Sequence, residues 1–184
     1  MIRKFLQKIF KTVSYSFFLK IHGKIVKSIT SDNDNRIKVK AINIGKNLKY
    51  NIYKISDGRL YTDRIHDTAV ILDNKIIKEP SFQLRHSYDS KIYNSKVREN
   101  IVFTKGTPRK LRNLNGSILS LLTGGGGNNN YWHWLFDVLP RLALCSKTVN
   151  LSELDYFLLP AHTKKFQIES LDHLSIPKNK RISS

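Results

Sequence analysis

The stretch Ser120–Leu142, SLLTGGGGNNNYWHWLFDVLPRL, decides the fold of this chain. The apolar residues around its start predict a buried strand over 117–123, and the four glycines that follow permit positive φ angles or close approach by another molecule. Apolar periodicity from Tyr131 onward predicts a helix over 130–147. A strand, a glycine-rich loop and a helix in this order are typical of α/β proteins.

Three polar side chains of the predicted helix recur at i, i+4 and i+8: His133, Asp137 and Arg141. At 3.6 residues per turn they follow one slowly rotating stripe, and an imidazole, a carboxylate and a guanidinium together are suited to moving a proton and holding an anion. The alternative is structural, with Asp137 paired to Arg141 and His133 capping the helix. Pro140 lacks a backbone N–H and is expected to kink or end the first helical segment at Leu139.

The rest of the chain divides into regions of different character. Short runs rich in Ile, Val, Leu and Tyr over 37–103 predict a β-meander, and later alternation predicts a strand at 155–159 and a helix at 164–174. We expect a basic amphipathic helical segment over 1–30, a linker over 31–36, and a lobe over 37–184 that is β-rich over 37–110 and α/β over 111–184.

Composition indicates an ordinary globular protein. The 184 residues are 40% hydrophobic and 25% charged, enough for one well-cored domain. The single cysteine, Cys145, excludes an internal disulfide and is expected to pack as a small apolar residue. Asp32-Asn33-Asp34 spells a DxD motif but lies in the linker, and the histidines are scattered, so no metal is predicted.

The net charge is +18, from 32 Lys and Arg against 14 Asp and Glu. The lysines are dispersed along the whole chain, whereas a nucleic-acid module typically concentrates them on one face. We therefore expect weak polyanion affinity and no specific nucleic-acid partner.

The amino-terminal segment has its own pattern: Phe5, Ile9, Val13 and Phe17 follow helical spacing, with lysines elsewhere on the wheel. Its longest uncharged run, 12–19, is too short to span a bilayer, and no clear signal-peptide cleavage site follows it. The helix either docks on an anionic membrane surface or packs against the protein. The expected location is the cytoplasm, with or without peripheral attachment to the inner membrane.

The motif NNYWHWLFDVLPRL is similar to the signature of glycosyltransferase family 61, a family that is associated with capsular or other surface polysaccharide synthesis. Five further segments resemble the same family in the same order: SDGRLYTD (56–63), AVILDNKII (69–77), FTKGTPRKL (103–111), DYFLLP (155–160) and FQIESLDHLSIP (166–177).

The resemblance implies an inverting, nucleotide-sugar-dependent glycosyltransferase with the GT-B arrangement, in which two Rossmann-like lobes face a cleft. This chain would be the amino-terminal lobe, and the donor-binding carboxy-terminal lobe is expected to be absent. We therefore expect a truncated or split transferase that is inactive alone and that a partner chain completes. Its partners would be a glycan acceptor and a nucleotide sugar, with no further cofactor.

General chemistry, applied to the sugar transfer that the resemblance implies, suggests roles for particular residues, because Asp or Glu is the usual base in such reactions and aromatic rings often stack on sugars. Asp137 would be the catalytic base, tuned by His133, and substrate would contact Gly125, Gly126, Gly127, Asn129, Asn130, Tyr131, Trp134 and Arg141. The alternatives are that the glycines form a flexible connector and that at least one tryptophan belongs to the core. Two other functions remain open: a noncatalytic interaction domain with the same fold, and a basic module that binds a membrane surface or nucleic acid.

Overall fold

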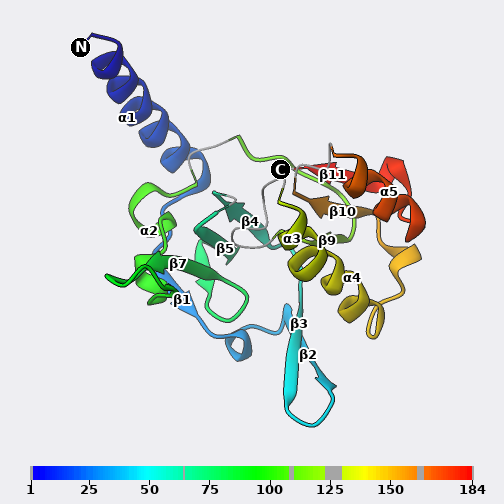
Figure 1. Ribbon diagram of the computed structural model, residues 1–184. Coiled ribbons are helices and arrows are strands. Elements are labelled where there is room, and N and C mark those ends of the chain that lie inside the picture. The colour runs from blue at the N-terminus through cyan, green and yellow to red at the C-terminus, as the bar shows by residue number, and fades with distance from the viewer. Residues whose placement is uncertain (1, 64, 108–109, 123–129, 161–163, 184) are drawn as a thin grey trace. The chain divides into compact units, whose positions relative to one another are not determined.

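The structure is a computed structural model that describes residues 2–63, 65–107, 110–122, 130–160 and 164–183 (Figure 1). The protein is a mixed α/β protein, as predicted, and it forms two compact units. Unit 1 comprises residues 1–37, 55–62 and 67–113, and unit 2 comprises residues 38–54, 63–66 and 114–184.

Unit 1 contains a mostly antiparallel sheet in the order β1-β6-β5-β7-β8, with β4 also paired to β5. The hairpins β4–β5 and β5–β6 follow the expected meander, but β1 joins β6 in parallel and so brings part of the segment 1–30 into the sheet. Its elements are α1 (Ile2–His22), β1 (Lys27–Ile29), β4 (Arg59–Thr62), β5 (Asp67–Leu72), β6 (Lys75–Ile77), β7 (Phe82–His86), β8 (Ile92–Asn94), α2 (Val102–Lys105) and the short 3-10 turns Ser31–Asn33 and Val97–Glu99.

A buried ion pair ties the strands of unit 1 together. The Asp67 carboxylate on β5 accepts hydrogen bonds from both terminal nitrogens of Arg85 on β7, each at 3.0 Å, and from the backbone N–H of Ile101 at 3.0 Å. The Asp67 side chain is only 4% exposed and that of Arg85 is 30% exposed. A buried carboxylate requires such partners, because loss of water otherwise makes its charge costly.

Unit 2 contains a parallel sheet with the strands in chain order, β9-β10-β11, each pair joined by helices in a βαβαβ arrangement. The predicted strands and helices are confirmed to within a few residues. The elements are the hairpin β2 (Ile37–Ile44) and β3 (Leu48–Ile55), β9 (Ile118–Ser120), α3 (Tyr131–His133), the π-helix Trp134–Val138, α4 (Leu139–Ser146), β10 (Tyr156–Leu159), α5 (Lys165–His173), β11 (Arg181–Ser183) and the 3-10 turns Leu151–Glu153 and Lys178–Lys180.

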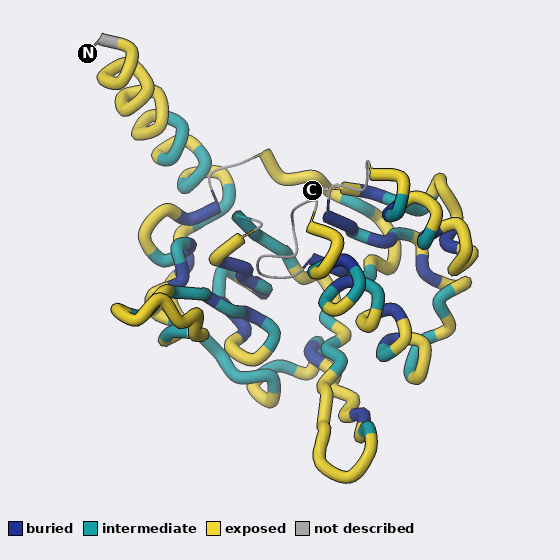
Figure 2. Tube along the Cα trace, viewed as in Figure 1, coloured by how far each residue is buried: buried dark blue, intermediate teal, exposed yellow. Residues whose placement is uncertain are grey.

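The core of unit 2 forms between this sheet and its helices (Figure 2). Trp134, Val138 and Leu142, spaced four apart, meet the strand residues Phe157 and Leu159, and all five are at least 96% buried. This is the apolar face that the helical spacing predicts. Nearby, Cys145 is also buried, as expected, and burial raises the pKa of its thiol.

The effect of Pro140 differs from the expected kink. The helix continues from residue 131 to 146, but Trp134–Val138 winds as a π-helix, and the Leu139 N–H bonds to the Trp134 carbonyl five residues back. Pro140 lies in the first turn of α4. Since proline cannot donate to the carbonyl four residues back, a widened turn just before it accommodates the missing bond without ending the helix.

The segment 31–36, predicted as a linker, contains the 3-10 turn Ser31–Asn33 and ends at Arg36. The Arg36 guanidinium bonds to Asp34 at 2.8 Å and also to Asp73. The hydrogen bonds that Asp34 accepts from the Arg36 side chain and from the Arg36 backbone N–H lower the pKa of its carboxyl to about 2. The second aspartate of the DxD sequence is therefore paired with Arg36.

Candidate functional site

The candidate site lies at the start of the helix that follows β9. Ligands of parallel α/β sheets bind beyond the carboxyl ends of the strands, and α3 begins after such an end. Residues 123–129, which include Gly125, Gly126, Gly127 and Asn129, lie outside the described residues. The described part of the site is therefore the helix itself.

Asn130 starts the helix. Its side-chain oxygen accepts a hydrogen bond from the Trp132 N–H at 2.9 Å, and its carbonyl accepts one from the Trp134 N–H at 3.1 Å. This is an N-cap, which satisfies backbone donors that the first turn leaves without helical partners. Asn130 thus fixes where the following side chains begin, a role that was not predicted from the sequence.

The central feature is a direct contact between His133 and Asp137. His133 Nδ1 lies 2.6 Å from Asp137 Oδ2, and the two side chains are 35% and 42% exposed. An ionised carboxylate can only accept hydrogen bonds, so Nδ1 carries the proton and the other ring nitrogen, Nε2, keeps the lone pair when the ring is neutral. The pair therefore offers a ring nitrogen with a free lone pair, on a partly exposed side chain whose tautomer a carboxylate holds.

Arg141, the third member of the predicted stripe, makes a different contact. Its Nη1 donates to the Leu122 carbonyl at 3.0 Å, which connects α4 to the chain just after β9. Burial lowers the pKa of the guanidinium, and the nearby charge of Asp137 partly opposes that effect. The structural alternative from the sequence was an ion pair between Asp137 and Arg141. The hydrogen bond of Asp137 in the structure is instead with His133.

An exposed aromatic pair lies on the same helix. The rings of Trp132 and Phe136 have centroids 4.3 Å apart with planes tilted by 40°, and the residues are 66% and 57% exposed. Two adjoining exposed rings form an apolar platform of the kind that sugar rings stack on. Phe136 was missed as a site residue, although its i, i+4 spacing from Trp132, away from the apolar face, is visible in the sequence.

Trp134 and Tyr131, both expected to contact substrate, have different surroundings. Trp134 is 1% exposed and its indole N–H donates to Ser170 Oγ at 2.8 Å, so it is a core residue and leaves no ring face for a ligand. Its position on the stripe shared with Val138 and Leu142 explains this correction. Tyr131 is 55% exposed and packs edge-on against Phe166 at 4.9 Å, which leaves part of its side chain open to solvent.

The described part of the chain contains no cluster of side chains that could hold a metal ion. Among those residues, no three side chains of His, Cys, Asp or Glu come close enough together to hold an ion.

Comparisons with known proteins give no match: no family model, no curated protein and no solved structure is similar to this chain at the level searched. The fold and the site by themselves define an α/β protein with a histidine–carboxylate pair and an aromatic platform on one helix.

Proposed function

We propose that this chain contributes the acceptor-side lobe of an inverting glycosyltransferase that acts in surface polysaccharide synthesis. The observation that carries the proposal is the 2.6 Å contact between His133 and Asp137 on the helix that also presents Trp132 and Phe136. The resemblance of 129–142 to glycosyltransferase family 61 supports it. So does the order β9-β10-β11, because a βαβαβ unit with its strands in chain order is half of a Rossmann-like lobe, as GT-B enzymes require.

In the proposed mechanism the acceptor sugar stacks on Trp132 and Phe136 and places one hydroxyl next to His133. Nε2 of His133 takes the hydroxyl proton while the oxygen attacks the anomeric carbon of the nucleotide sugar. The bond from that carbon to the nucleoside diphosphate breaks, and its electron pair leaves with the diphosphate. The new bond forms on the opposite face, which inverts the anomeric centre.

The roles within the pair are the reverse of those expected from the sequence. Asp137 accepts from Nδ1, so it fixes the tautomer of His133 and stabilises the imidazolium that forms. Asp137 is then a positioning residue and His133 is the base. Arg141, Gly125, Gly126, Gly127 and Asn129 remain proposed contacts with the donor or the acceptor.

Glycan binding tests the aromatic platform. The chain has two tryptophans, so labelling with 5-fluorotryptophan gives two ¹⁹F resonances, which Trp132→Phe assigns. A panel of di- and trisaccharides built from common hexoses and N-acetylhexosamines is expected to shift the Trp132 resonance and leave that of the buried Trp134 in place. Phe136→Ala should weaken binding about fivefold to tenfold, because it removes half of the platform.

The opposite result would count against the site. If no glycan of the panel moves the Trp132 resonance, or if only the Trp134 resonance moves, the aromatic pair is not the acceptor platform.

Transfer activity tests the polar pair. Extracts from cells that lack the gene, supplied with wild-type protein, are expected to transfer labelled sugar from nucleotide sugars to endogenous acceptor. Asp137→Asn should lower the rate at least about a hundredfold, because a neutral amide in place of the carboxylate no longer enforces the Nδ1–H tautomer of His133. The rate and the amount of soluble protein are measured together.

The matched control is Glu169→Gln, which makes the same acid-to-amide change in an exposed pair with Lys165, 64% and 88% exposed. It should leave transfer unchanged. Wild-type transfer by the Asp137→Asn protein would remove the pair from the mechanism, and absence of any transfer that depends on the wild-type gene would refute the glycosyltransferase itself.

A further inference from the structure

Helix α1 exposes a continuous apolar stripe. Its members are between 45% and 73% exposed, far more than large apolar side chains of a packing helix, and they recur at spacings of three and four: Phe5, Leu6, Ile9, Phe10, Val13, Phe17 and Ile21. This is the arrangement of an amphipathic helix whose apolar side has no partner within the described residues.

The helix contacts the rest of unit 1 through its other side. Leu19 packs so closely on Gly106 that a Cβ added to the glycine would lie 2.8 Å from Leu19 Cδ2. The His22 carbonyl accepts a hydrogen bond from Arg59 at 3.3 Å, and within the helix the His22 ring stacks on Phe18 at 5.6 Å on the same side as Leu19. At 100° per residue these side chains are centred roughly opposite the apolar stripe. The apolar stripe is therefore not the surface by which α1 packs.

The positive charge of α1 distinguishes between the partners that could cover the apolar stripe. Five Arg and Lys residues lie in α1, and no Asp or Glu occurs anywhere in the first 31 residues. Two copies of the chain that buried their stripes against each other would also bring two strongly basic helices together, which costs electrostatic energy. An anionic lipid surface instead offers opposite charge to the lysines and hydrocarbon to the stripe.

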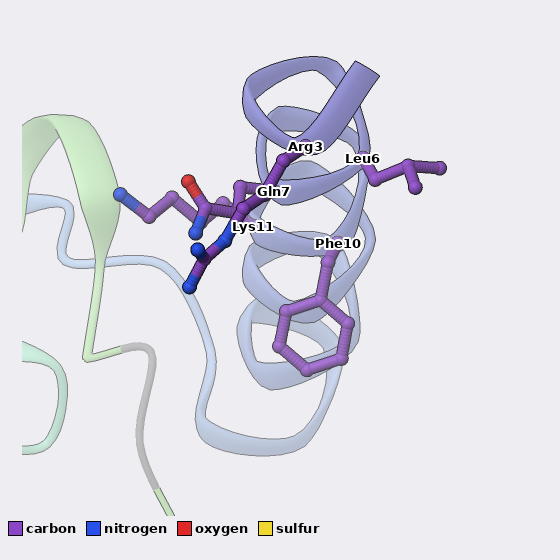
Figure 3. A pocket seen from close by; sticks show the side chains of 5 residues that line it. All are labelled: Arg3, Leu6, Gln7, Phe10 and Lys11. Atoms are coloured by element: carbon purple, nitrogen blue, oxygen red, sulfur yellow. The ribbon is translucent and has the colours of Figure 1, made fainter. Parts of the chain in front are cut away.

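A hollow at the start of α1 shows the same separation of side chains (Figure 3). It is lined by residues of this one helix, with Leu6 and Phe10 on one side and Arg3, Gln7 and Lys11 on the other. A single helix cannot enclose a small molecule, so the hollow is the boundary between its apolar and basic sides. Within the described residues, no helix is long and apolar enough to cross a membrane.

We propose that α1 docks the protein on an anionic membrane surface. The helix lies in the plane of the interface, and its apolar stripe inserts among the lipids. The inference goes beyond glycosyl transfer and does not depend on it. Phe10 and Phe17 are two aromatic anchors of the stripe, because both are large and well exposed, at 73% and 58%. Arg3 and the lysines of α1 supply attraction to the headgroups.

Vesicle binding by the full chain tests the proposal. Flotation with phosphatidylcholine vesicles that contain about 30% phosphatidylglycerol should carry the protein upward, and pure phosphatidylcholine vesicles should carry little. Salt at about 0.5 M should weaken binding, because it screens the headgroup attraction. The double variant Phe10→Ser and Phe17→Ser should lower the partition coefficient at least about tenfold with no change of charge.

The matched control is Val39→Ser with Leu48→Ser, two exposed apolar residues of the hairpin β2–β3. It should bind like wild type, and circular dichroism should show full helix content in both double variants. The proposal is overturned by absent binding, by equal binding to neutral vesicles, or by equal losses in both double variants. It is also overturned if sedimentation shows a dimer that only the phenylalanine variant dissociates while vesicles stay unbound. None of these results alters the transfer assay in extracts, so the two proposals fail separately.

Discussion

Trp134→Ala is expected to destabilise unit 2 by about 3–5 kcal/mol, the range for removing a buried tryptophan. The side chain is 1% exposed and packs in one cluster with Val138, Leu142 and Phe157, so alanine would leave a cavity that the helix and sheet cannot close. The change also removes the hydrogen bond to Ser170 Oγ. A loss of this size is a large fraction of the stability of a small unit, so unit 2 should be mostly unfolded at moderate urea concentrations.

The control for this prediction is two residues away. Trp132 is 66% exposed, so Trp132→Ala should change the free energy of unfolding by less than about 0.5–1 kcal/mol. Hydrogen exchange measured at increasing urea concentrations reports the stability of each unit separately. Only amides of unit 2, such as those of β10, should lose protection in Trp134→Ala. Equal effects of the two substitutions would mean that Trp134 does not anchor the core.

These two tryptophans show what the sequence could establish. Apolar spacing alone predicts the helix and the shared stripe of Trp134, Val138 and Leu142, and the structure confirms both. The same spacing places Trp132 and Phe136 away from that stripe. Trp134 was nevertheless expected to contact substrate because aromatic rings often stack on sugars, and the spacing did not establish which of the two tryptophans is the buried one. The structure shows that it is Trp134.

The candidate pair could be predicted because His133 and Asp137 are four residues apart in one helix, and that spacing brings side chains together. The π-turn was not predicted, since it depends on how the helix accommodates Pro140 while its apolar side stays in the core. Contacts between distant segments were also missed. The pairing of β1 with β6 and the hydrogen bonds of Asp67 join residues that no local pattern connects.

Asp67→Ala is expected to destabilise unit 1 strongly. It removes a carboxylate that is 4% exposed, leaves the Ile101 N–H without that acceptor, and takes from Arg85 two hydrogen bonds of 3.0 Å each. Removing one partner of a buried pair costs about 3–5 kcal/mol. Arg85 is 30% exposed and also donates to the carbonyls of Leu84 and Glu99, so the loss should fall near the lower end of that range.

Two comparisons distinguish a buried ion pair from simple loss of an acid. Asp89→Ala breaks an exposed pair with Lys91, 53% and 82% exposed, and should cost less than about 1 kcal/mol. In an Arg85→Ala background, Asp67→Ala should cost measurably less than in wild type, because the two residues are energetically coupled. Urea unfolding of wild type, of the two single variants and of the double variant gives the coupling free energy between Asp67 and Arg85 directly. A coupling of zero would mean that Asp67 stabilises unit 1 through the Ile101 N–H alone, and that the contact between β5 and β7 owes its stability to the apolar side chains around it.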